Sequence, residues 1–248
     1  MTTARPTTGS ASDRGRRRYN ADALAVRARG GGLGVAVADG IGDTVEAYGA
    51  AHAAADAAAH FAASGSALDA LLGAQSALGG EGDAVLVVAA LRADRGEIAW
   101  VGDCRAYFYG GTVVHQLTSD QTMAAAVREA GVPTPPPRWE HIVTQSVRSA
   151  ARDTVGQAAI PAGVGRLALV TDGVHRELSS DEIAAVLAFA PGAALAAREL
   201  TDLALLAGGG DNASATVVEM PLVPVLPVQH TDTGPAFPEV VEHQAETA

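Results

Sequence analysis

Short apolar runs separated by glycine- and aspartate-rich turns recur along the middle of the chain. They cover residues 33–38, 84–91, 98–102, 105–110, 112–117, 166–171 and 214–220. Continuous apolar runs of this length, bounded by turn residues, are typical of strands buried in a core. Tight turns join the four runs between residues 84 and 117, which predicts an antiparallel β-meander.

Alanine-rich segments lie between these runs. We expect helices over residues 45–63, 66–78, 119–131, 179–190 and 193–206, and a segment of mixed character over 138–162. Ser179 and Glu182 have the spacing of a capping box, which marks a helix start. Because the helices are grouped apart from the hairpins, the pattern predicts an α+β fold in which sheets pack on each other and helices lie outside.

The two ends of the chain differ from its middle. Residues 1–13 are rich in Thr, Ser, Gly and Ala, and we expect a disordered N-terminal segment there. Repeated prolines interrupt residues 221–248, which predicts a disordered, Pro-rich tail. One continuous domain, residues 14–220, lies between them.

The charge, the apolar content and the cysteine count of the chain argue against several classes of protein. The net charge of -11 argues against a general nucleic-acid binder, which needs a positive surface. The sequence contains no window of about 18 uncharged apolar residues, so no membrane-spanning helix is expected. The start of the chain lacks the apolar stretch of a secretory signal, and the single cysteine, Cys104, forms no internal disulfide. We therefore expect a soluble, cytoplasmic protein.

Four aspartates stand at the ends of predicted strands: Asp39, Asp103, Asp172 and Asp211. Singly, an Asp-Gly pair is ordinary turn chemistry. Carboxylates that converge at one end of a β core would repel one another, and a divalent cation removes that penalty. Ligands made of oxygen alone favour Mg²⁺ or Mn²⁺ over Zn²⁺ or Cu²⁺. Together the aspartates favour a metal site over four unrelated turns.

Several segments resemble a known family. In order they are RRRYNADAL, VADGIGD, WVGDCRAY, LTSDQT, VTDGV and GGGDNASATVV, between residue 14 and about residue 220. The order and spacing resemble the bacterial branch of the metal-dependent Ser/Thr protein phosphatases (PPM, type 2C). The resemblance implies a four-layer αββα sandwich, in which two antiparallel sheets are flanked by helices and metals sit at one end of the sheets.

The resemblance also implies a set of metal ligands. Asp39 would bridge two Mn²⁺ or Mg²⁺ ions, and the Gly40 carbonyl would bind one of them. Asp172 and Asp211 would complete the other. Asp103 matches a position that helps to hold a third, weaker ion in bacterial members.

Two further residues receive roles from the resemblance. Arg17 would grip the substrate phosphate, and Asp22 would orient metal-bound water. The implied activity is hydrolysis of phosphoserine and phosphothreonine in a phosphorylated protein substrate, by attack of a metal-activated hydroxide. A Ser/Thr protein kinase is a plausible partner, whereas neither nucleic acid nor a membrane is expected.

The chain departs from the family pattern at a few positions. Ala21 stands where the family has Glu, and Asp43 where it has Gly. Ile41 cannot act as an acid, Cys104 replaces a serine, and Gln121 replaces a histidine. These departures support a rival hypothesis, a pseudophosphatase that binds phosphoproteins or a regulator with little turnover.

Several residues and segments also have a simpler, purely structural interpretation. Arg16–Arg18 resembles a solvated basic run, and only its offset from Asp22 favours Arg17 as a site residue. Cys104 lacks the arginine six residues later that a cysteine phosphatase needs, so we expect a small buried residue. The stretch GGGLG, residues 30–34, predicts a hairpin turn and not a phosphate loop. The seven histidines lack metal-ligand spacing, and we expect them on the surface or in packing.

Overall fold

The structure is a computed structural model that describes residues 6–161 and 165–220. Within these residues, ten strands form two antiparallel sheets of five strands each, sheet A and sheet B. Sheet A has the order β1 (Thr7–Asp13), β10 (Ala213–Met220), β9 (Gly165–Val170), β6 (Arg105–Tyr109) and β7 (Val114–Gln116). Sheet B has the order β2 (Asp22–Arg29), β3 (Gly32–Gly40), β4 (Ala84–Leu91), β5 (Arg95–Val101) and β8 (Gly156–Pro161).

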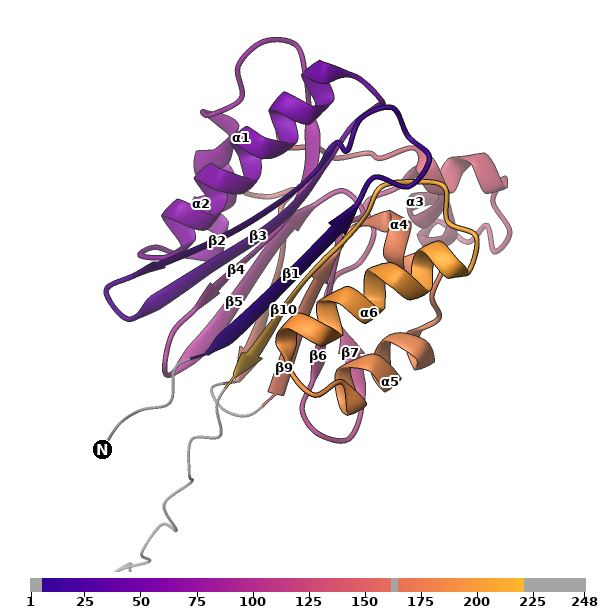
Figure 1. The fold of residues 1–248 in the computed structure, drawn as a ribbon. Helices are drawn as coiled ribbons and strands as arrows, with labels where there is room; N and C mark the ends of the chain where they lie inside the picture. Colours follow the sequence, from indigo (N-terminus) through magenta and orange to yellow (C-terminus); the bar gives the residue numbers. More distant parts are fainter. Residues whose placement is uncertain (1–5, 162–164, 221–248) are drawn as a thin grey trace, which may run out of the picture.

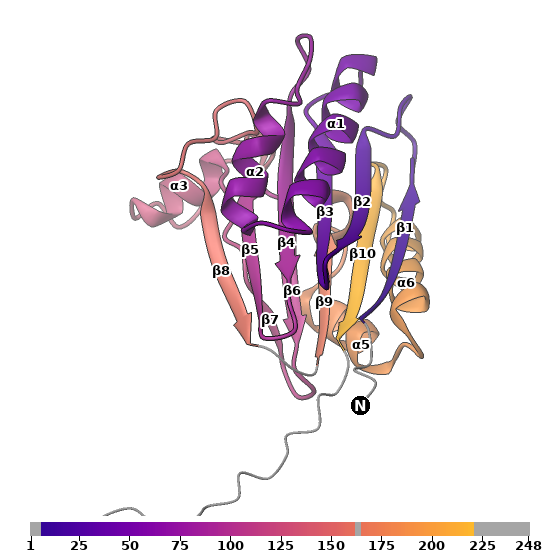
Figure 2. The ribbon, with the colours of Figure 1, turned by 90° about the vertical axis from the view of Figure 1, so that its left-hand side faces the viewer.

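Helices cover the outer face of each sheet. Those on sheet B are α1 (Val45–Ala62) and α2 (Ala67–Gln75), and those on sheet A are α5 (Ser180–Phe189) and α6 (Ala193–Leu206). Shorter elements are α3 (Met123–Glu129), the 3₁₀ helix η1 (Pro137–His141) and α4 (Asp172–His175). Figures 1 and 2 show the resulting layers, helix, sheet, sheet and helix. The predicted α+β class and αββα sandwich are confirmed.

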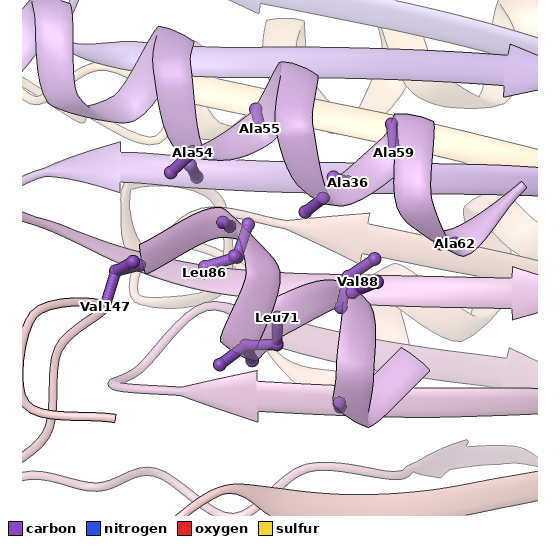
Figure 3. Packing of buried hydrophobic residues seen from close by; sticks show 14 of the residues in the cluster. Ala36, Ala54, Ala55, Ala59, Ala62, Leu71, Leu86, Val88 and Val147 are labelled. Carbon is purple, nitrogen blue, oxygen red and sulfur yellow. The ribbon is translucent and has the colours of Figure 1, made fainter. Parts of the chain in front are cut away.

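Small side chains bring α1 very close to sheet B. Its buried positions are all alanines, and they face β3 and β4, where Ala36, Leu86 and Val88 are fully buried (Figure 3). Leu71 of α2 and Val147 join the same cluster. Alanine suits this layer because it favours helix and leaves little side-chain volume between helix and sheet.

Three hydrophobic clusters fill the three spaces between the four layers. One lies between sheet B and the pair α1 and α2, and a second lies between the two sheets. The third lies between sheet A and the pair α5 and α6. This core holds both sheets in fixed relative positions, so the strand ends form a rigid frame.

The predicted β-meander over residues 84–117 is wrong in one respect. β4 pairs with β5, and β6 pairs with β7, but β5 and β6 belong to different sheets. The chain crosses from sheet B to sheet A at Gly102–Cys104, where Gly102 has a φ of 87°. Such a left-handed conformation suits glycine, which lacks a Cβ. The crossover places Asp103 between the two sheets.

The predicted disorder over residues 1–13 is also wrong for Thr7–Asp13. These residues form β1, which pairs along its whole length with β10. The strand lies at the edge of sheet A and is mostly exposed, which explains its polar composition. Gly9 is buried against α6, where a Cβ would lie 2.2 Å from the Cα of Ala194. Residues 1–5 and the predicted tail, 221–248, lie outside the described residues.

Three more local predictions can be compared with the structure. The GGGLG stretch contains the turn of the β2–β3 hairpin, with positive φ at Gly30 and Gly31, although β2 itself was not expected. The capping box of Ser179 and Glu182 opens α5. The third predicted helix is shorter, because α3 starts only after its N-cap Thr122. No helix in the described part of the chain has the length and apolar character needed to span a membrane.

Candidate active site

All four strand-ending aspartates lie at the same end of the sandwich. Asp39 is near the end of β3, Asp103 lies in the crossover, Asp172 begins α4, and Asp211 precedes β10. They line one pocket of about 150 Å³. The rest of its lining is Arg17, Gly40, Ile41, Gly42, Asp43, Val85, His141, Val143, Arg176 and Asn212. The two sheets therefore bring together carboxylates that are far apart in the sequence.

Asp22 and Asp39 face each other across neighbouring strands. Asp22 begins β2 and is the register partner of Asp39 on β3. Burial, and to a lesser extent the charge of Asp211, raises the pKa of Asp22 to about 7. Burial and then repulsion from Asp22 raise the pKa of Asp39 well above its usual range. Burial and mutual repulsion therefore favour the protonated form of the two carboxyl groups, and Arg17 offsets this only in part at Asp22.

Thr171 connects the two sheets at the pocket. Its hydroxyl donates to Oδ2 of Asp22 at 2.8 Å and accepts from the backbone N–H of Ser214 at 3.1 Å. Oδ1 of Asp22 is buried and finds no hydrogen-bond partner within the described residues. Thr171 is also the N-cap residue of α4, which carries Asp172, and its backbone carbonyl accepts the N–H groups of Val174 and His175. Burial and then repulsion from Asp103 raise the pKa of Asp172 well above its usual range.

Glycines next to two of the aspartates allow close backbone approach. A Cβ on Gly40 would lie 2.4 Å from the carbonyl oxygen of Ala47, in the first turn of α1. A Cβ on Gly173 would lie 2.0 Å from the carbonyl oxygen of Asn212. Neither Asp-Gly pair is a free turn, because one ends β3 and the other begins α4. These glycines let the helices and strands of the site pack together.

Arg17 lies on the loop between β1 and β2 and points to Asp211. Its Nη2 is 2.5 Å from Oδ2 of Asp211, and both side chains are substantially exposed. Asp43 holds the same loop, because its carboxylate accepts the backbone N–H groups of Arg18 at 3.1 Å and Tyr19 at 2.9 Å. Asp43, a departure from the family pattern, is thus an anchor for the loop that carries Arg17.

Asn212 fixes the loop from the other side. Its Nδ2 donates to the carbonyls of Arg14 at 2.8 Å and Tyr19 at 2.9 Å. Its Oδ1 accepts the backbone N–H of Ala21 at 2.8 Å. Asn212 therefore holds the segment with Arg17 and Asp22 next to Asp211.

Arg176 occupies the opposite wall of the pocket. Its Nη2 donates to Oδ2 of Asp103 at 2.8 Å and to the carbonyl of Glu140 at 2.8 Å, and lies 3.2 Å from Oδ2 of Asp172. Its Nη1 contacts the ring of His141. Neither Arg176 nor His141 was predicted from the sequence as a site residue.

Two departures from the family pattern have structural roles near Asp103. Cys104 is 1% exposed, and burial raises the pKa of its thiol well above the usual range, so it is the small buried residue that was predicted. Gln121 accepts the backbone N–H of Gly102 at 2.9 Å and donates to the carbonyl of Thr154 at 2.8 Å. Gln121 therefore fixes the crossover that carries Asp103.

The chemistry of the pocket suits a divalent cation. Its oxygen donors and raised carboxylate pKa values fit Mg²⁺ or Mn²⁺. However, among residues 6–161 and 165–220, no group of three or more His, Cys, Asp or Glu side chains is arranged so that it could hold an ion. The guanidinium groups of Arg17 and Arg176 serve as counter-charges in this arrangement. An ion that binds Oδ2 of Asp211 would have to displace the guanidinium of Arg17 from that oxygen.

Solved structures share this architecture. The catalytic domain of the Ser/Thr protein phosphatase PstP, in complex with two manganese ions, has a TM-score of 0.73 and 25% identity, with 86% of this chain and 97% of that chain covered. The chain has the fold of the PPM phosphatases. Stp1 of Staphylococcus aureus, a serine/threonine phosphatase, has a TM-score of 0.78 at 18% identity, covering 88% of this chain and 96% of that one.

A third PPM-fold structure is MsPP of Mycobacterium smegmatis, a PPM Ser-Thr phosphatase in complex with cacodylate. It has a TM-score of 0.68 and 23% identity, and 87% of this chain and 98% of that chain are covered. No protein-family model and no curated protein matches the sequence. The PPM fold is therefore recognised here through structure and through the short motifs at the strand ends.

Proposed function

We propose that the protein is a metal-dependent phosphoprotein phosphatase that hydrolyses phosphoserine and phosphothreonine. The observation that carries this proposal is the single pocket formed by Arg17, Asp39, Asp172 and Asp211, with the Gly40 backbone beside them. Each of these residues comes from a different part of the sandwich or its loops, yet all reach the same place. The PPM fold supports the same activity.

Charge explains why the site needs cations. A phosphate monoester carries about -1.5 to -2 charges at neutral pH, and a pocket of carboxylates alone would repel it. Two divalent ions, held by Asp39, the Gly40 carbonyl, Asp172 and Asp211, would neutralise that charge and supply water of lowered pKa. The manganese complex of PstP supports this choice of ion.

The chain's own residues orient the substrate. Arg17 is exposed and its partner Asp211 is a proposed metal ligand, so its guanidinium is available to bind phosphoryl oxygens when Asp211 binds an ion. Oδ1 of Asp22, buried and without a partner among the described residues, is placed to hold a proton or to accept one from water. Ile41 at the rim is exposed but has no proton to give, so solvent protonates the leaving alkoxide.

The reaction needs an accessible phosphorylated side chain. The pocket opens to solvent near Arg17 and Ile41, both of which are exposed. We propose a phosphorylated protein as the substrate, and a Ser/Thr protein kinase as the partner that generates it.

The decisive experiment is hydrolysis of p-nitrophenyl phosphate and a phosphothreonine peptide, with EDTA, Mg²⁺ or Mn²⁺. We expect Mn²⁺-dependent turnover in the wild type and a loss of at least 100-fold in Asp172→Asn. Asp202→Asn is the matched control, because Asp202 is an exposed residue on α6 outside the pocket. Turnover that persists in EDTA or in Asp172→Asn would overturn the proposal.

The rival is a pseudophosphatase, which the substitution at Ala21 favours. Ala21 is 2% exposed and its N–H is bonded to Asn212, so it belongs to the frame of the site. The rival predicts that Mn²⁺ binds by calorimetry while neither substrate is hydrolysed, and that Ala21→Glu creates activity. Hydrolysis by the wild type excludes it.

A further inference from the structure

We propose that Arg176 is a built-in cation that takes the place of a third divalent ion beside Asp103. The resemblance implied such an ion, and the structure instead places a guanidinium on the same carboxylate. The proposal concerns the wall of the pocket opposite Arg17. It rests on the proposed function only in assuming that the other carboxylates of the pocket bind two ions.

The contacts of Arg176 form a built site. Three acceptors on separate segments converge on its Nη2: Asp103 at 2.8 Å, the Glu140 carbonyl at 2.8 Å and Asp172 at 3.2 Å. The side chains of Asp103, Asp172 and Arg176 are 5%, 13% and 22% exposed, respectively. A guanidinium held by three partners in a buried place is thus already paired with both carboxylates. An added ion would have to displace it.

The guanidinium of Arg176 and a metal ion would compete for the same carboxylate, that of Asp103. Arg176 uses Oδ2 of Asp103, and the whole Asp103 residue is 4% exposed, so little room remains for a hydrated ion on this carboxylate. Mg²⁺ and Mn²⁺ usually keep several waters when a protein supplies only one or two carboxylates. A guanidinium needs no such waters and offers several donors in a planar arrangement.

Arg176 also fixes the wall above the pocket. Through the Glu140 carbonyl and the His141 ring it holds η1 next to α4. Arg128 of α3 binds the Glu140 side chain, so α3 joins the same unit. A metal ion on Asp103 would not make these contacts with η1. Arg176 therefore has a positioning role in addition to its charge.

Another buried arginine, Arg166, makes a similar set of contacts away from the pocket. Arg166 also binds a carboxylate and two carbonyls, and its side chain is 14% exposed. It lies at the start of β9, whereas the pocket is at the end of that strand. Arg166→Gln is therefore a matched control for removing a buried arginine that does not touch the site.

The test counts bound Mn²⁺ by calorimetry and by electron paramagnetic resonance. We expect two equivalents in the wild type and in Arg166→Gln, and a third, at least 10-fold weaker, in Arg176→Ala. The third should disappear in Arg176→Ala/Asp103→Asn. Arg176→Lys, which keeps one positive charge, should remain at two. An Asp103-dependent third ion in the wild type, or none in Arg176→Ala, would overturn the proposal.

A second measurement requires no metal. In EDTA, Arg176→Ala should lower the thermal midpoint by about 5–10 °C, because it leaves buried carboxylates without a partner. Adding Asp103→Asn should restore part of that loss, whereas no such coupling is expected between Arg166 and Asp103. Absence of coupling between Arg176 and Asp103 would contradict the built-in cation. Failure of the proposed function would appear separately, as a wild type that binds no Asp172-dependent ion.

Discussion

Two arginines bind aspartates in the same pocket, and they do so in different surroundings. The side chains of Arg17 and Asp211 are 42% and 36% exposed, and the contact is a single pair. Arg176 and Asp103 are 22% and 5% exposed, and the arginine has further partners on α4 and η1. The same residue types therefore form an open contact on one wall and a buried network on the other.

Under the proposed function, the difference suits the two arginines to different roles, one in binding the substrate and one in holding the site together. An exposed ion pair contributes about 0–1 kcal/mol, so it exchanges partners easily when an ion or a phosphate arrives. Removal of one member of a buried pair costs about 3–5 kcal/mol, because the other charge remains without compensation. If the protein is the proposed phosphatase, Arg17 is suited to exchange partners during turnover, and Arg176 is suited to keep its partners.

The largest expected effect is on catalysis, through Arg17. Arg17→Ala should lower kcat/KM by about 100- to 1,000-fold, because it removes the donor for the phosphoryl charge. Its free energy of unfolding should change by less than about 1 kcal/mol. Steady-state kinetics and urea denaturation measure the two quantities. If the free energy of unfolding fell by as much as the activation free energy rose, Arg17 would be a structural residue.

The next effect is on stability, through Arg176. Arg176→Met keeps the apolar volume of the side chain but removes its charge, and should lower the free energy of unfolding by about 3 kcal/mol in EDTA. The kcat/KM of the folded variant should fall less than that of Arg17→Ala. Denaturation curves at fixed pH test this, with Arg166→Gln for comparison. A stability equal to that of the wild type would show that Arg176, like Arg17, contributes little to the free energy of unfolding.

A pH effect follows from the buried carboxylates. Burial raises the pKa of Asp22 from an ordinary value of 3.8 to about 7 in the folded protein, so the native state holds an extra proton between these two pH values. The contribution of Asp22 to stability in EDTA should therefore be largest at low pH and fall as pH rises toward 7, by up to about 1.4 kcal/mol per pH unit. Mn²⁺ should oppose the loss.

The control for the pH effect is Asp22→Asn, which should have a shallower decline between pH 5 and 7. His175 acts in the opposite direction, because burial lowers its pKa to about 4 and stability is lost as pH falls from 6.5 toward that value. That contribution is common to both proteins and cancels in the comparison. Identical slopes for wild type and variant would contradict the assigned pKa.

The smallest expected effect concerns the loop that carries Arg17. Asp43→Gly removes the acceptor for the N–H groups of Arg18 and Tyr19 and should raise KM by about 3- to 10-fold, with kcat less affected. Asp43→Asn keeps an acceptor oxygen and should lie closer to the wild type. A lower KM in the glycine variant would show that Asp43 restrains the loop against binding.

The sequence was sufficient to predict most of the frame and part of the site. Asp39 and Asp172 could be predicted as site residues because each directly follows an apolar run, which is a local pattern in the sequence. β1 was missed because its composition is polar and its stability comes from pairing with β10, about 200 residues away. β2 and the change of sheet after β5 were missed because short strands carry no signal for which partner they choose.

Arg176 was missed for a related reason. Its partners Asp103 and Glu140 lie 73 and 36 residues earlier, and no spacing in the sequence connects them. Asn212 was visible only as the neighbour of Asp211, whereas its role depends on three backbone groups of the loop 14–21. Residues that act through long-range contacts therefore required the three-dimensional arrangement.

The pairing of β1 with β10 has a consequence for synthesis on the ribosome. Of the described elements, β1 is made first and β10 last, so β1 waits for its partner until about residue 220 has been made. Sheet B contains neither strand and can assemble earlier. Arg17 and Asp211, which flank the late pair, meet only at that stage. Under the proposed function, we expect the nascent chain to remain inactive until β10 is in place.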